Sequence, residues 1–68
     1  MRLSARNQLP GVVEEVRLGD VMAHVAVRVG ENVVESVIKR TSAEELGLKP
    51  GDTVRVVVKS TEVMIQKD

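Results

Sequence analysis

The chain has 68 residues, 10 basic and 10 acidic side chains, no cysteine and no aromatic residue. The neutral balance and the missing aromatics argue against a nucleic-acid partner, because neither a basic surface nor a stacking platform is available. Without cysteine there are no disulfides, and the lone His24 makes a structural zinc site implausible. No apolar run reaches membrane-spanning length and no signal-peptide pattern opens the chain, so we expect a cytoplasmic protein with no membrane partner.

A chain this short buries a thin core, and such chains commonly gain stability from disulfides, a metal or partner subunits. The composition excludes disulfides and a structural metal site, so association with further copies is the remaining source of stability. We therefore expect one domain, residues 1–68, that works as an oligomer.

Valine-rich stretches predict the strands. Residues 12–16 form the first, after Pro10, which fits an edge or a bend. Residues 21–29 alternate apolar with other side chains throughout, which is the clearest strand signal. The second face of residues 21–29 is only half polar, so a neighbouring subunit is expected to cover it. A turn at Gly30 leads into residues 33–39.

Residues 41–48 carry the helical signal. Ser42 and Glu45 fit a capping box, with Thr41 as the alternative cap, and Gly47 suits the left-handed residue that ends a helix.

After a Pro-Gly turn, residues 53–59 and Glu62–Gln66 read as the last two strands. The predicted fold class is all-β with one short helix. Five strands, with the helix between the third and fourth, suggest a five-stranded OB-like barrel.

Two polar clusters, one near each end of the chain, form the candidate site. Their residues are Ser4, Ala5, Arg6, Asn7 and Gln8 at one end, and Lys59, Ser60 and Thr61 at the other. They offer cationic and hydroxyl donors and no carboxylate, which suits a small, fully ionised anion. Each cluster alone can also be ordinary turn or strand-end residues. The pairing of the two favours a site, because the terminal strands of such a barrel often come close together.

Catalysis has no support in the sequence. No nucleophile is marked near His24, which we interpret as a strand residue facing an interface or solvent. The carboxylates are not paired for acid–base work, and no glycine-rich phosphate loop is present. We expect neither an enzyme nor a catalytic cofactor.

The segment Ser4–Val13 resembles the opening signature of the Mop family, the molbindins, and the similarity continues through Gly19–Val25, Thr41–Leu48, Gly51–Asp52 and Lys59–Ile65. The resemblance covers essentially the whole chain. It implies an OB-like, Mop/TOBE-like barrel assembled as a homohexamer, a trimer of dimers. It also implies that molybdate or tungstate is bound between subunits, for intracellular storage or homeostasis.

The resemblance further implies which residues hold the oxyanion. The matching contact positions are Ser4, Arg6, Lys59 and Ser60, with Ser42 at the start of the helix. The expected backbone donors are Ala5, Asn7 and Thr61. The metal is bound only within its oxyanion, so no residues that ligate a metal directly are expected. The sequence does not choose between molybdate and tungstate, because the two anions are nearly equal in size and charge.

One alternative from another class stays open. The chain can be an oligomerising interaction or sensor module whose anion site is vestigial. An OB-type nucleic-acid binder is disfavoured by the charge balance and the missing aromatics.

The thin core predicts a stable homo-oligomer at micromolar concentration. Size exclusion coupled to light scattering gives the mass directly. A clean monomer would contradict both the argument from the core and a site between subunits.

Overall fold

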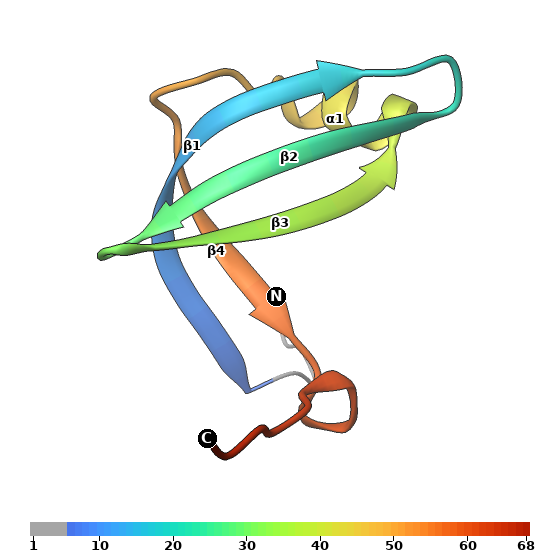
Figure 1. The fold of residues 1–68 in the computed structure, drawn as a ribbon. Helices are drawn as coiled ribbons and strands as arrows, with labels where there is room; N and C mark the ends of the chain where they lie inside the picture. Colours follow the sequence, from blue (N-terminus) through green and yellow to red (C-terminus); the bar gives the residue numbers. More distant parts are fainter. Residues whose placement is uncertain (1–5) are drawn as a thin grey trace.

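The fold is a strongly curved antiparallel sheet with one helix at one end (Figure 1). The computed structural model describes residues 6–68. The elements in chain order are β1 (Asn7–Leu18), β2 (Met22–Val29), β3 (Asn32–Lys39), α1 (Arg40–Leu46), β4 (Thr53–Val58) and the 3-10 helix η1 (Ser60–Glu62). The strand order is β3-β2-β1-β4, so β1 pairs with both β2 and β4. The prediction of a mostly β fold with one short helix is confirmed.

Strand β1 has 12 residues and pairs with two neighbouring strands, one along each half of its length. Its first half pairs with β4 and its second half with β2, with a bulge between Val13 and Glu15. At the crossing point a Cβ on Gly11 would lie 2.7 Å from the carbonyl oxygen of Arg28. Glycine is therefore required there for close approach of the backbones. Of the two alternatives predicted for Pro10, an edge or a bend, the structure has the edge: β1 is continuous there and pairs only with β4 at that position.

The core lies on the concave face of the sheet. Its buried side chains are Val13, Ala23, Val25, Val27 and Ala43. Partly buried apolar residues pack against them: Val16, Val29, Ile38, Leu48, Val54 and Val56. The alternation predicted for residues 21–29 thus places the odd positions 23, 25 and 27 inward. No side chain larger than valine is fully buried among the described residues, as expected for a thin core.

The start of helix α1 differs from the prediction. The helix begins at Arg40, directly after the extended Lys39, and no side chain caps it. The predicted capping box of Ser42 and Glu45 is therefore wrong, as is the alternative cap Thr41. The physical reason is a tertiary contact, since the first amide, Arg40 N–H, donates to the carbonyl oxygen of Val21 at 2.7 Å.

The end of the helix agrees with the prediction. Gly47 takes the left-handed conformation, with φ 62° and ψ 36°. Its N–H donates to the carbonyl oxygen of Glu44 at 3.0 Å, and Leu48 N–H donates to that of Ala43 at 3.2 Å. This is a Schellman motif, which satisfies the last carbonyls of the helix.

No helix within residues 6–68 has the length and apolar character needed to cross a bilayer.

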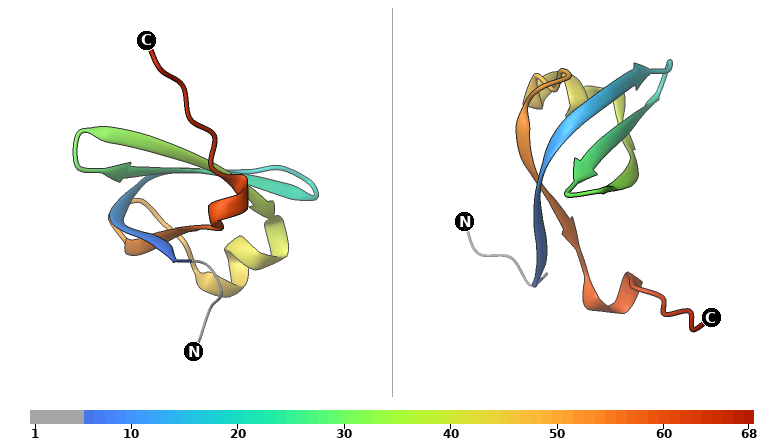
Figure 2. Two further views of the ribbon diagram at one scale, coloured as in Figure 1. Left: turned by 90° about the horizontal axis from the view of Figure 1, so that it is seen from below. Right: turned by 60° about the vertical axis from the view of Figure 1, so that its left-hand side comes forward.

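The fifth predicted strand, Glu62–Gln66, is not part of the sheet. Glu62 ends η1, and the residues after it pair with no strand in the described chain. The sheet is consequently four-stranded and open, which corrects the predicted five-stranded barrel. The reason is the direction of the chain: after η1 it runs away from the body, so no edge of its own sheet lies beside it (Figure 2).

The crossing at Gly11 yields a stability prediction. Gly11→Ala should lower the free energy of unfolding by about 1–3 kcal/mol, the usual cost of overpacking, because the new methyl group meets backbone. Urea unfolding at one fixed protein concentration measures the change. Val12→Ile adds a methyl group at the next, exposed position and should stay within about 0.5 kcal/mol of wild type. Equal stability of Gly11→Ala and wild type would refute the close approach.

Candidate functional site

The two polar clusters meet at one end of the β1–β4 pair. The last pair in that ladder joins Asn7 to Val58. The next residues outward are Arg6 on one side and Lys59 on the other. Antiparallel pairing therefore places side by side two chain positions, those of Arg6 and Lys59, that are far apart in the sequence. Ser4 and Ala5, the other members of the N-terminal cluster, lie outside the described residues.

Arg6 differs from the other described arginines. The side chains of Arg17, Arg28 and Arg40 each reach a glutamate, and Arg55 donates to Gln8. Arg6 has no hydrogen bond or ion pair with any residue in the range 6–68. An exposed guanidinium without an acceptor is free to bind an anion bidentately.

Lys59 adds a second cation at the same place. It is exposed and extended, with φ −68° and ψ 142°, and within the described chain its ammonium group has no carboxylate partner. Two neighbouring cations repel each other, so an anion placed between them is favoured by both.

The 3-10 helix η1 places hydroxyl groups next to Lys59. Ser60 and Thr61 are exposed within it, and Glu62 N–H donates to the Lys59 carbonyl oxygen at 2.9 Å. That bond turns the chain immediately after β4 and keeps both hydroxyl groups near the end of the strand. The first amides of a helical turn have no partner within the turn, so Thr61 is also a candidate backbone donor.

Ser42 lies elsewhere. It is a half-buried residue of α1, and α1 is at the other end of the molecule from η1 (Figure 1). A single chain does not bring Ser42 to Arg6 and Lys59. The helix also begins two residues before Ser42, so the expected first amide of the helix belongs to Arg40 and is already bonded to Val21.

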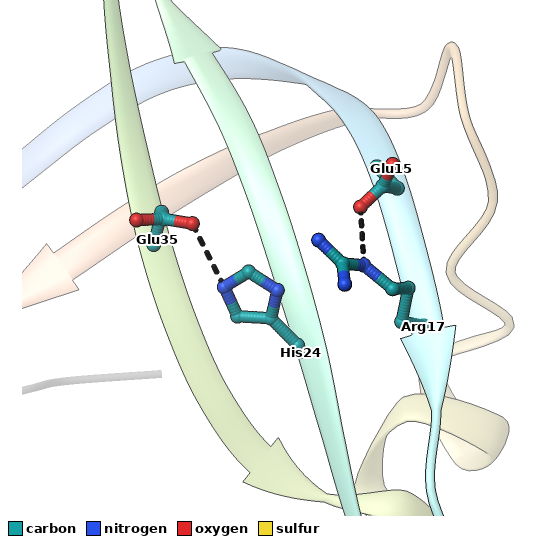
Figure 3. Close-up of polar contacts among 4 residues, drawn as sticks. All are labelled: Glu15, Arg17, His24 and Glu35. Carbon is teal, nitrogen blue, oxygen red and sulfur yellow. Dashed lines mark hydrogen bonds and ion pairs between the residues drawn. The ribbon is translucent and has the colours of Figure 1, made fainter.

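A separate set of polar contacts occupies the convex face of the sheet (Figure 3). Nε2 of His24 lies 3.0 Å from Oε1 of Glu35, and Nε of Arg17 lies 2.6 Å from Oε1 of Glu15. These are cross-strand and same-strand pairs on a partly solvated surface, and His24 is a strand residue there, as interpreted from the sequence. Within residues 6–68, no group of three or more His, Cys, Asp or Glu side chains is placed to hold a metal ion.

Sequence reasoning gave no role to Arg55. The structure places its guanidinium 3.2 Å from Oε1 of Gln8, across the β1–β4 ladder near the candidate site. The register of the two strands creates this contact, and nothing in the local sequence signals it.

The family comparison matches residues 3–65 to the TOBE domain, so the chain belongs to the TOBE domain family. Among its relatives is molybdenum-pterin-binding protein 2 of Clostridium pasteurianum, which is 48% identical over 66 residues. The alignment covers 96% of this chain and 97% of that protein. The resemblance to the Mop proteins seen in the sequence is confirmed.

Two solved structures share the fold. A molybdate-binding protein from Sporomusa ovata superimposes with a TM-score of 0.95 at 36% identity, covering 98% of this chain and 100% of that one. The cytoplasmic molybdate-binding protein ModG, in a form with molybdate bound, gives a TM-score of 0.82 at 38% identity. That match covers 88% of this chain and 43% of ModG.

The juxtaposed cations generate a binding prediction. Arg6→Ala or Lys59→Ala should each weaken binding of a tetrahedral dianion by about 1.5–3 kcal/mol, the range for hydrogen bonds to charged groups. Lys49→Ala, which removes an exposed lysine from the turn before β4, should leave affinity unchanged. Calorimetric titration with molybdate measures all three. Equal affinities in the three variants would refute the site.

Proposed function

We propose that this chain binds molybdate or tungstate between the subunits of a cytoplasmic homo-oligomer and serves storage or homeostasis of the anion. It performs no catalysis and needs no catalytic cofactor. The oligomer is a homohexamer, a trimer of dimers, of single-domain chains. The observation that supports the proposal is the meeting of Arg6 and Lys59 at the end of the β1–β4 pair, with no carboxylate partner for either within residues 6–68. Molybdate is named for two of the similar structures, and molybdenum for the curated relative.

The chemistry of the donors fits this class of anion. Molybdate at neutral pH is a dianion with four acceptor oxygens and no proton. Arg6 offers a forked pair of donors, Lys59 a compact charge, and Ser60 a short hydroxyl bond. Ser4 adds a second hydroxyl group and Ala5, Asn7 and Thr61 add backbone amides in the proposed site.

The same donors disfavour competing anions. Near pH 7 phosphate retains a proton in part of its population, and that proton needs an acceptor which a donor-only site does not supply. Sulfate has the correct protonation state but is smaller, so the size of the cavity must exclude it. Tungstate matches molybdate in both respects and is expected to bind as well.

A position between subunits explains two features of the single chain. Arg6 and Lys59 are exposed, and charged hydrogen bonds strengthen when water is excluded. Ser42 lies at the far end of the same chain, so it reaches the anion only from a neighbouring copy. Assembly would supply both the burial and this additional hydroxyl group.

The second candidate is an oligomerising interaction or sensor module with a vestigial anion site. The exposed apolar residues Met64 and Ile65, 93% and 90% accessible, favour association by themselves and say nothing of an anion. Calorimetric titration of the purified protein with molybdate separates the two functions, because a vestigial site gives no heat of binding.

A ligand held between subunits must stabilise the assembly. Binding to the oligomer, and not to separated or unfolded chains, contributes roughly 2.7 kcal/mol per site at a hundredfold excess over the dissociation constant. The melting temperature should therefore rise with added molybdate or tungstate, and also with protein concentration. Differential scanning calorimetry at constant ionic strength measures both effects.

Two controls make that measurement specific. Sulfate and phosphate at the same concentration should shift the melting temperature much less, for the reasons of size and protonation given above. Arg6→Ala should still assemble but lose most of the molybdate-specific shift. An equal shift in wild type and Arg6→Ala would mean nonspecific stabilisation, and the storage function would fail.

A further inference from the structure

Arg55 and Gln8 form a polar pair on the exposed face of the β1–β4 ladder. In the register of the two strands, Gln8 lies opposite Val57, two residues after Arg55. Opposite residues of an antiparallel pair share a face, and side chains alternate along each strand. Val54 and Val56, on either side of Arg55 in the chain, pack against the core. Arg55 and Gln8 therefore lie on the other face, where both are exposed.

The same face leads to the candidate site. Arg6 precedes Gln8 by two residues and Lys59 follows Val57 by two, so alternation places both cations on the face of Gln8. Two residues of a strand span about 7 Å, a distance that a tetrahedral anion with a hydrogen bond on each side bridges. Gln8 is thus the polar side chain that stands between the two cations and Arg55.

The contact with Arg55 fixes which way the Gln8 amide faces. Nη1 of Arg55 donates to Oε1 of Gln8 at 3.2 Å. A guanidinium has donors and no acceptor, so the amide must turn its oxygen, and not its nitrogen, toward Arg55. The amide nitrogen then lies on the other side of the amide carbon. It carries two N–H groups, so Gln8 has donor capacity for an anion besides its other contacts.

We propose that Arg55 is a specificity-determining residue of the anion site, because it holds the Gln8 carbonyl oxygen away from the anion and leaves only N–H donors facing it. Without Arg55 the amide is free to rotate by half a turn and present its oxygen. That oxygen is the acceptor which the proton of phosphate needs. Arg55 thereby favours fully ionised molybdate over a protonated anion while touching neither. The inference rests on the proposed function and adds a residue that sets the selectivity of the same site.

A direct effect of the Arg55 charge is the competing explanation. Arg55 lies four residues along β4 from Lys59, about 13 Å at the usual rise of a strand. That separation exceeds the screening length of about 8 Å at physiological ionic strength, so exposed charges interact weakly across it. A charge would also attract molybdate, sulfate and phosphate dianions alike. The orientation of an amide, in contrast, distinguishes a protonated anion from an ionised one.

Calorimetric titration of the purified protein with molybdate, and competition by inorganic phosphate at pH 7, give the ratio of the two dissociation constants. Arg55→Met keeps much of the length of the side chain but removes its donors. The preference for molybdate over phosphate should fall at least about tenfold, the size of one hydrogen bond to a charged group. The matched control Arg17→Met removes the same charge from the convex face, where Arg17 pairs with Glu15, and should keep the wild-type ratio.

Sulfate supplies the readout that a purely structural role would not give. Sulfate carries no proton at pH 7, so Arg55→Met should leave the preference for molybdate over sulfate unchanged while the preference over phosphate falls. A structural defect would weaken all three anions together. An unchanged ratio of molybdate to phosphate, or an equal fall against sulfate and phosphate, would overturn the proposal.

Two further variants test whether Arg55 acts through Gln8. Arg55→Lys keeps a cation that only donates, so it should retain most of the wild-type ratio. A ratio as low as that of Arg55→Met would contradict the mechanism. A chain with Gln8→Leu has no amide to orient, so adding Arg55→Met should change its ratio no further. A further fall in that chain would show that Arg55 acts without Gln8 and would also overturn the proposal.

The wild-type titration keeps the two failures apart. If wild type gives no heat with molybdate, the proposed function is wrong and the role of Arg55 falls with it. If wild type binds molybdate and Arg55→Met keeps the wild-type preference over phosphate, only the role of Arg55 is wrong and the anion function stands.

Discussion

The antiparallel pairing of β1 with β4 is the contact on which the candidate site depends. It runs from Val12 and Thr53 to Asn7 and Val58, and its open end carries Arg6 and Lys59. The pairing needs β1 to continue through Pro10 and Gly11 without interruption, and Gly11 permits it by leaving room for the backbone of β2. The candidate site combines residues from the two ends of the chain, so it depends on the register in which β1 pairs with β4.

The second constraint is the size of the core. Valine and alanine supply all of the buried side chains within residues 6–68, and the sequence has no aromatic residue to add volume. Such a core covers the concave face of the sheet only in part, which leaves an apolar hollow lined by β3, β4 and the end of α1 open and the apolar residues 63–65 exposed. Both observations have the same physical origin, since 68 residues without disulfides cannot enclose their apolar surface alone.

The fold is shared more closely than the sequence. The Sporomusa ovata protein keeps the chain path with a TM-score of 0.95 although about two thirds of the aligned residues differ. Valine-rich alternation, a glycine where backbones cross and a glycine that ends the helix are requirements of pattern, and many sequences meet them. The charged ends of β1 and β4 are not required by the fold, which is why they carry the functional argument.

The sequence by itself determined the mostly β class, the inward positions 23, 25 and 27, the end of the helix at Gly47 and the residue types of the two polar clusters. These features depend on local alternation, turn chemistry and residue type, so they can be read from neighbours in the chain. Only the tertiary structure decided the start of α1, where the Val21 carbonyl oxygen replaces a capping side chain, and the meeting of Arg6 with Lys59. It also decided that Glu62–Gln66, although strand-like in composition, stays outside the sheet. A strand exists only where another edge is beside it, and the position of an edge is a property of the whole fold.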